Sequence, residues 1–196
     1  MPKIFNEQER GVIRCKLLDA GIEILSHKRY RDIAIDEITA EVGIAKGTFY
    51  NFFSSKEAFF YEVMQLIKER NRDSLKSLIA GEHPSKEEVI DCLYCRYTQL
   101  KTVYDYFTPE EMKLIARKLP NGDSQNDSVE FAGFICKHLT GLNADEKAAV
   151  VVVMCNMLAL AASNRSLFEP EGYEQAVRIF CNAMAEYIFD KIEKRN

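Results

Sequence analysis

Apolar residues recur at steps of three and four positions along most of this chain, and this spacing limits the folds that it can adopt. One stripe runs through Ile13, Leu17 and Ile24, and comparable stripes lie within residues 60–67 and 173–188. A period of 3.6 residues places such side chains on one face of an α-helix, whereas a half-buried strand alternates with a period of two. Because alternating segments are scarce, the sequence predicts an all-α protein.

Polar side chains mark where several of these helices begin. Ser85 with Glu88, and Thr108 with Glu111, have the spacing of a capping box, in which a hydroxyl accepts a backbone N–H and the carboxylate accepts one in return. Pro109 suits the first position of the helix after Thr108. Periodicity and caps together predict about nine helices, over residues 7–27, 35–42, 46–52, 55–79, 86–104, 109–118, 127–140, 144–164 and 171–193.

Composition and charge exclude several classes of protein. The chain has 196 residues, and an apolar content of 47% is too high for a disordered protein. Its longest apolar run, residues 148–162, is shorter than the ~20 residues of a membrane-spanning helix, and the first thirty residues lack the apolar run of a secretory signal. We therefore expect a soluble, cytoplasmic protein without a membrane partner, whose six cysteines are reduced.

The net charge bears on binding to nucleic acid. The whole chain carries a formal charge of -4, which argues against broad, nonspecific coating of DNA. Residues 1–56, however, hold nine basic and eight acidic side chains, and the acidic excess lies in the remainder. This distribution is compatible with a small DNA footprint in the N-terminal part.

Two very short predicted helices, 35–42 and 46–52, flank Gly43. Glycine can adopt a positive φ and turn the chain sharply after the first helix. Ile38 and Phe49 are spaced so that the two helices can bury facing sides. Two short helices joined in this way form a helix-turn-helix, whose second helix enters the major groove of DNA.

A helical wheel sorts the second of these helices into two faces. Phe49 and Phe53 point inward and Phe52 lies at the edge. The residues on the outer side and at the helix N-terminus are Lys46, Gly47, Thr48, Tyr50 and Asn51. An outward Asn can pair with adenine through two hydrogen bonds, Lys at the N-terminus suits a phosphate, and Gly allows close approach of the backbone. In the alternative interpretation, Thr48 and Asn51 are only solvated polar residues.

The stretch Ile33–Phe60 carries a longer pattern of fixed order and spacing. Its elements are Ile38, Gly43, Lys46-Gly47-Thr48, Tyr50, Phe53 and Ser55-Lys56-Glu57. This pattern resembles the DNA-binding signature of the TetR (tetracycline-repressor-like) family of bacterial regulators. The resemblance implies that Tyr50 and Lys56 contact phosphates, and that Lys46, Thr48 and Asn51 approach bases or backbone. The chain departs from the pattern at Ala34, where the family usually has a Ser or Thr cap, and at Phe52, where relatives often have a polar contact to the groove.

The resemblance also implies a division of the chain. We expect a helix-turn-helix DNA-binding domain over residues 1–54 and a helical ligand-binding and dimerisation domain over residues 55–196. The last two helices are apolar on more than one face, which implies a partner. The candidate dimer residues are Met154, Leu158, Phe180, Met184 and Tyr187. The candidate ligand contacts are Tyr94, Tyr97, Tyr104, Phe131, Phe134 and His138, although ordinary core packing explains most of them.

Residues 80–196 contain no Gly-rich phosphate loop, zinc-protease motif or nucleophile elbow, so we expect no enzyme activity, no cofactor and no metal. Cys92 and Cys95 form a CxxC inside a predicted helix without a second pair, which favours structural thiols. The sequence thus predicts a homodimeric repressor that an unknown small-molecule effector releases from a palindromic operator in double-stranded DNA. The alternatives are an activator, a ligand-binding or protein-interaction module that does not bind DNA, and an all-helical enzyme.

Overall fold

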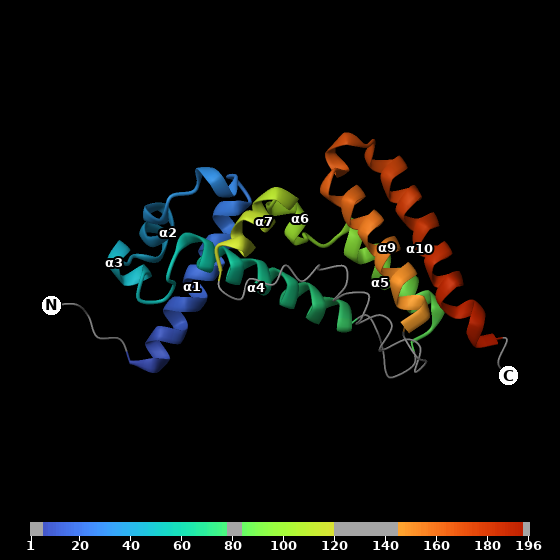
Figure 1. Cartoon of the computed structure of the whole chain (residues 1–196), viewed down its shortest axis with the longest axis horizontal. Helices are drawn as coiled ribbons and strands as arrows, with labels where there is room; N and C mark the ends of the chain where they lie inside the picture. Colours follow the sequence, from blue (N-terminus) through green and yellow to red (C-terminus); the bar gives the residue numbers. More distant parts are fainter. Residues whose placement is uncertain (1–5, 78–83, 120–144, 194–196) are drawn as a thin grey trace. The chain divides into compact units, whose positions relative to one another are not determined.

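The structure, a computed structural model, describes residues 6–77, 84–119 and 145–193. The elements in these ranges are α1 (Glu7–Leu25), the 3₁₀ turn η1 (Tyr30–Asp32), α2 (Ile35–Val42), α3 (Lys46–Phe49), α4 (Lys56–Lys76), α5 (Lys86–Thr98), α6 (Val103–Tyr106), α7 (Pro109–Arg117), α9 (Asp145–Ser163), the 3₁₀ turn η2 (Arg165–Leu167) and α10 (Pro170–Glu193) (Figure 1). Over these ranges there is no strand, which confirms the all-α prediction. The helix predicted over 127–140 lies outside the described residues.

The chain forms two compact units. The first comprises Met1–Ile67 and Tyr106–Ser124, and the second comprises Lys68–Asp105 and Gln125–Asn196. The predicted helix-turn-helix therefore shares a unit with α7, a helix that is distant in the sequence. The chain passes from the first unit to the second within α4 and returns within α6.

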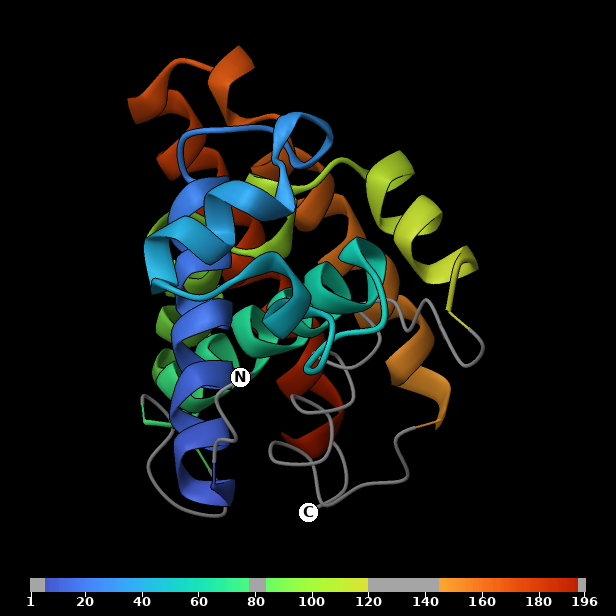
Figure 2. The same ribbon diagram turned by 90° about the vertical axis from the view of Figure 1, so that its left-hand side faces the viewer.

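Aromatic side chains build the core of the first unit. The ring of Phe59, on α4, lies 5.3 Å from that of Phe49 and 4.9 Å from those of Phe53 and Phe60, measured between centroids. Tyr30 packs edge-on against Phe60 at 5.2 Å. Edge-to-face contacts of this kind add to the stabilisation from burial. They hold α3 and its turn against α4. α2 packs across α1, and α3 contacts α2 (Figure 2).

α7 is bound to this unit by both apolar and charged contacts. The ring of Phe107 lies 6.1 Å from Phe60 within the aromatic core. Lys118 Nζ, just after α7, pairs with Glu57 Oε1 at 2.6 Å, and Arg31 Nε lies 3.8 Å from Glu111 Oε1. Because Glu57 lies in the first turn of α4 and Arg31 lies in η1, these pairs fix α7 to the elements that support the short helices.

The two predicted capping boxes are confirmed. Thr108 Oγ1 accepts the Glu111 N–H at 3.2 Å, and Glu111 Oε2 accepts the Thr108 N–H at 3.0 Å. Ser85 and Glu88 make the same exchange at 3.2 and 2.7 Å. α7 and α5 therefore begin where the sequence indicates.

In the second unit, α9 and α10 run side by side in opposite directions, and α5 packs against both (Figure 1). Fully buried side chains from the three helices meet in one core, among them Leu93 and Tyr97 of α5, Cys155 of α9, and Cys181 and Met184 of α10. The hydroxyl of Tyr97 donates to the carbonyl oxygen of Cys155 at 3.3 Å, which satisfies a polar group inside this apolar core.

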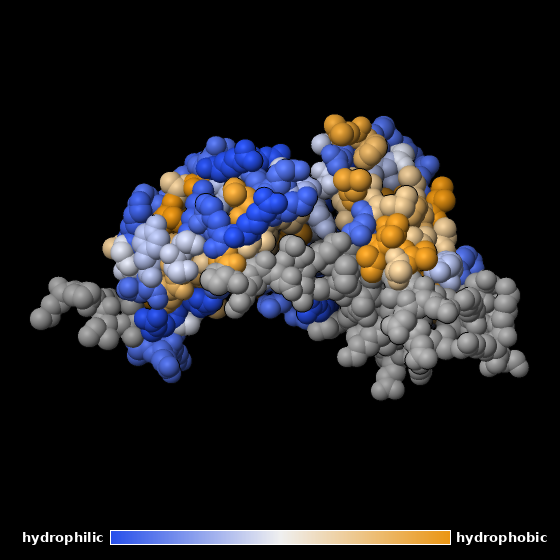
Figure 3. Space-filling model, viewed as in Figure 1, coloured by the Kyte–Doolittle hydropathy of each residue, from blue (hydrophilic) through white to orange (hydrophobic). Residues whose placement is uncertain are grey.

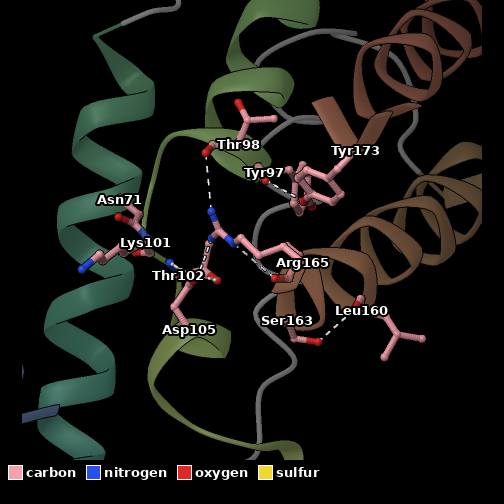
Figure 4. A network of polar contacts seen from close by, with 11 residues as sticks. Asn71, Tyr97, Thr98, Lys101, Thr102, Asp105, Leu160, Ser163, Arg165 and Tyr173 are labelled. Atoms are coloured by element: carbon pink, nitrogen blue, oxygen red, sulfur yellow. Dashed lines mark hydrogen bonds and ion pairs between the residues drawn. The ribbon is translucent and has the colours of Figure 1, made fainter. Parts of the chain in front are cut away.

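A polar network separates α5 from α6, so the single helix predicted over 86–104 is wrong (Figure 4). Arg165 Nη1 donates to the carbonyl oxygen of Thr98, the last residue of α5, at 3.5 Å, and Nη2 donates to Asp105 Oδ1 at 2.5 Å. Asp105 Oδ2 accepts the Thr102 N–H at 2.7 Å, as in a helix N-terminus. The partner Arg165 lies 60 residues beyond Asp105, where local spacing does not reveal it.

Candidate nucleic-acid interface

The turn between α2 and α3 has the geometry that the sequence predicts. Gly43 follows α2 with φ 73° and ψ 36°, in the left-handed region. At the other end of α2, Ala34 offers no side-chain cap, but Glu37 Oε1 accepts the Ala34 N–H at 3.0 Å. Glu37 also pairs with Lys28, and this hydrogen bond lowers the pKa of Glu37. The start of α2 therefore has only the carboxylate half of a capping box, supplied by Glu37.

α3 is shorter than predicted, ending at Phe49 instead of residue 52. The backbone continues as a tight turn, because the N–H groups of Asn51 and Phe52 donate to carbonyls three residues earlier, those of Thr48 and Phe49, at 3.1 and 2.9 Å. Such bonds commonly close the last turn of a helix. The predicted inner face is confirmed, since Phe49 and Phe53 are buried.

The predicted outer face is accessible. Lys46, Gly47, Tyr50 and Asn51 are exposed and Thr48 is half-buried. Lys46 Nζ pairs with Asp36 Oδ2 at 2.8 Å, and this hydrogen bond raises the pKa of Lys46. Because both side chains remain largely in solvent, the pair is weak and its ammonium group can move to another anion.

Gly47 has no packing reason to be glycine. A Cβ atom built on it would meet nothing within 4 Å, and the residue lies inside α3, where glycine costs stability relative to alanine. The open space above Gly47 is therefore available to a partner that approaches the backbone.

Lys56 occupies a different environment from the other candidates. It is half-buried, Nζ donates to the carbonyl oxygen of Tyr30 at 2.7 Å, and burial lowers the pKa of its ammonium group. One hydrogen bond leaves two N–H groups of the ammonium for other acceptors. The structure thus gives Lys56 a packing role in addition to the predicted contact.

The turn after α3 also makes a contact that the local pattern misses. Arg10 of α1 donates from Nη2 to the carbonyl oxygen of Asn51 at 3.3 Å, and its guanidinium lies 5.0 Å from the centroid of Phe52. Arg10 and Asn51 are 41 positions apart in the sequence, so no local spacing indicates this pair.

The candidate ligand residues do not form one cluster within the described chain. Tyr97 is buried in the core of the second unit, whereas Tyr94 and Tyr104 are half-buried. Tyr94 lies in an open groove of about 660 Å³ between α5 and α10, where its hydroxyl donates to Glu174 Oε2 at 3.4 Å. Phe131, Phe134 and His138 lie outside the described residues.

The candidate dimer residues differ in exposure. Leu158 and Met184 are buried within the second unit, Met154 and Phe180 are half-buried, and Tyr187 is exposed. Other large apolar side chains of α9 and α10 are more exposed, namely Val150, Val153, Met157, Leu160 and Ile179. Figure 3 shows apolar residues gathered over α9. Because α9 is apolar nearly all round, the sequence did not indicate which side faces outward.

Within the described ranges, no group of three or more His, Cys, Asp or Glu side chains is arranged to hold a metal ion. Burial raises the pKa of the Cys92 thiol to about 12, so this member of the CxxC is a poor nucleophile. None of the described helices is long and apolar enough to cross a membrane.

Comparison with known proteins places these features in context. Residues 17–63 match the family described as bacterial regulatory proteins, tetR family. The chain is 34% identical over 67 residues to the uncharacterized HTH-type transcriptional regulator YvdT of Bacillus subtilis, a match that covers 34% of each chain. It is 39% identical over 56 residues to the HTH-type transcriptional repressor DhaR of a Mycobacterium species, covering 29% of this chain and 28% of DhaR. The chain thus matches about a third of the length of these relatives.

Solved structures are similar over most of the chain. A transcriptional regulator from Rhodococcus sp. RHA1 superposes with a TM-score of 0.65 at 16% identity, covering 88% of this chain and 96% of that one. The TetR family repressor AlkX from Dietzia gives a TM-score of 0.62 at 12% identity, with 90% and 95% covered. At such low identity the likeness establishes the fold alone.

Proposed function

We propose that this chain, whose residues 17–63 match the tetR family of bacterial regulatory proteins, is a member of that family and a cytoplasmic, homodimeric transcriptional regulator that binds double-stranded DNA. The observation that carries the proposal is the outer side of α3 and its turn. Gly47, Tyr50 and Asn51 are exposed there, while Phe49 on the inner side is buried in the aromatic core. A rigidly supported helix with an accessible outer face is what major-groove recognition needs.

The roles of the outer residues follow from their chemistry. Asn51 can donate to and accept from an adenine edge, and Gly47 lets the backbone come close to the groove. Lys46, Tyr50 and Lys56 can each donate to a phosphate. Thr48 is half-buried, so its hydroxyl has less access to the groove than the amide of Asn51. Asn51 therefore carries most of the proposed base readout.

A second copy of the chain is the proposed partner of the exposed face of α9 and α10. The apolar side chains of Val153, Met157 and Leu160 are more than half exposed there. They adjoin an apolar groove of about 510 Å³ between the two helices, lined in part by Met157, Tyr173 and Phe180. Exposed apolar area of this kind marks an interaction surface. In a two-fold dimer, two recognition helices would meet half-sites ~34–36 Å apart on a palindromic operator.

Release by a small molecule is the proposed means of regulation, and repression is the proposed effect. α4 continues from the first unit, which holds the proposed recognition helix, into the second unit. A ligand that favours one conformer of the second unit can therefore change the spacing of the recognition helices and lower DNA affinity.

The experiment combines site selection with one variant. The purified chain is used to select duplexes from a random library, and affinity is then measured for the selected duplex and for a scrambled duplex. Asn51→Ala should weaken binding to the selected duplex by ~1–3 kcal/mol and leave binding to the scrambled one nearly unchanged. Glu41→Ala, at an exposed position of α2, serves as a control for an ordinary surface change. Equal losses on both duplexes would refute base readout by Asn51, and no binding at low salt would favour a module that does not bind DNA.

A further inference from the structure

We infer that Arg10 of α1 is an additional DNA-contacting residue, which fixes the turn after α3 and offers its guanidinium to a phosphate. This inference rests on the proposed function. Arg10 Nη2 donates to the carbonyl oxygen of Asn51 at 3.3 Å, and its Cζ lies 5.0 Å from the ring centroid of Phe52. The Arg10 side chain therefore binds the backbone of Asn51, the proposed base-reading residue, and covers the ring of the adjacent Phe52.

The next arginine on the same helix shows what distinguishes Arg10. Arg14, one turn later, lies over the ring of Phe53 at 4.9 Å and also pairs with Glu62 of α4. Its charge is thus neutralised within the unit. Arg10 stacks in the same manner but is exposed, and no carboxylate among the described residues pairs with it. Its positive charge remains available to an external anion.

A DNA phosphate is the anion that fits this position. The guanidinium has five N–H groups in a planar fork that matches phosphate oxygens, and the hydrogen bond to Asn51 uses one of them. Phosphates flank the bases that a recognition element contacts, so a cation held beside Asn51 lies where the strand must pass. In this arrangement the half-buried ring of Phe52, which lies 6.5 Å from that of the buried Phe53, supports the guanidinium.

The test measures the salt dependence of DNA binding. The probes are the selected duplex and the scrambled duplex, each titrated with wild type and with Arg10→Ala at several salt concentrations. Loss of one phosphate contact should reduce the slope of log K against log salt by about 0.9 on both duplexes. Phe52→Ala keeps the charge but removes its support, and should weaken binding to the selected duplex. Arg117→Ala removes the same charge from an exposed position of α7 and should leave the slope unchanged.

The outcomes separate this inference from the proposed function. If wild type binds DNA and Arg10→Ala keeps the wild-type slope, the phosphate contact is wrong and the proposed function stands. A lower unfolding temperature for Arg10→Ala with an unchanged slope would likewise overturn it, because it would show a purely structural role. If Phe52→Ala binds the selected duplex with wild-type affinity, the ring does not support the guanidinium of Arg10. Failure of wild type to bind any duplex would overturn both proposals.

Discussion

Lys56 Nζ donates a hydrogen bond of 2.7 Å to the carbonyl oxygen of Tyr30 and lies 4.6 Å from the centroid of the Tyr30 ring. The first residue of α4 is thereby attached to η1, the turn that precedes α2. A residue that the TetR-like pattern presents as a phosphate contact thus also joins two elements of the first unit.

Two measurements distinguish the roles of Lys56. Lys56→Ala should lower the free energy of unfolding by about 1–2 kcal/mol, because a hydrogen bond and a cation–π contact are lost. If Lys56 also contacts a phosphate, the salt slope of DNA binding should fall by about 0.9. Lys113→Ala, at an exposed position of α7, provides the matched loss of charge. A variant that is destabilised while its salt slope equals that of wild type would assign Lys56 a structural role only.

Gly47→Ala should separate folding from DNA binding. The added Cβ meets nothing within 4 Å in the free protein, so we expect the free energy of unfolding to stay the same or rise by up to about 1 kcal/mol. Affinity for the selected duplex should fall, because the methyl group would occupy space that the DNA backbone needs. Thermal unfolding and a duplex titration on one preparation check both parts, and undiminished affinity would show that the groove does not reach Gly47.

Two glycines of α1 should respond in opposite ways to the same substitution. A Cβ on Gly21 would lie 2.7 Å from Phe59 Cζ in the aromatic core, whereas one on Gly11 would meet nothing within 4 Å. Gly11→Ala should therefore stabilise the protein by about 0.5–1 kcal/mol through helix propensity. Gly21→Ala should destabilise it by about 1–3 kcal/mol through overpacking. Denaturant unfolding of both variants tests this, and equal effects would contradict the close packing of α1 against α4.

Alkaline pH should destabilise the second unit through its buried thiols. Burial raises the pKa of Cys181 to about 12 from the ordinary value of 9.0. The folded state keeps this proton where the unfolded state loses it, so the free energy of unfolding should fall as pH rises from about 9 toward about 12. The slope from this one group approaches ~1.4 kcal/mol per pH unit.

Substitution of Cys181 tests the contribution of that thiol. Cys181→Ala and Cys181→Ser both lack a group that titrates in this range, so each should show a shallower decline with pH than wild type. Their absolute stabilities should differ, because serine buries a hydroxyl in an apolar core. Denaturant unfolding at several pH values measures the slopes, and a wild-type slope in both variants would contradict the assignment.

The helix starts were predictable because they depend on residues three or four positions apart. The capping boxes of Ser85 and Thr108 and the turn at Gly43 are local features, and each lies where the spacing indicates. The inner face of α3 follows from helical periodicity in the same way, and burial of Phe49 and Phe53 confirms it.

Features that depend on distant partners were not predictable in this manner. The end of α5 is set by Arg165, which binds Thr98 and Asp105 from 67 and 60 residues away. The outward side of α9 was undetermined for another reason. Apolar residues surround this helix, so periodicity alone cannot separate Leu158, which packs inside, from Met157, which is exposed.

The sequence by itself determined the all-α class, the position of the helix-turn-helix and the outer face of α3, since these follow from local spacing and from the tetR-family pattern. Only the tertiary structure decided that α7 belongs to the same unit as these short helices, that Lys56 is attached to Tyr30, and that Arg10 lies against Asn51 and Phe52. The physical reason is that these hydrogen bonds, ion pairs and cation–ring contacts join residues that folding brings together from distant parts of the sequence. Local spacing contains no information about such pairs.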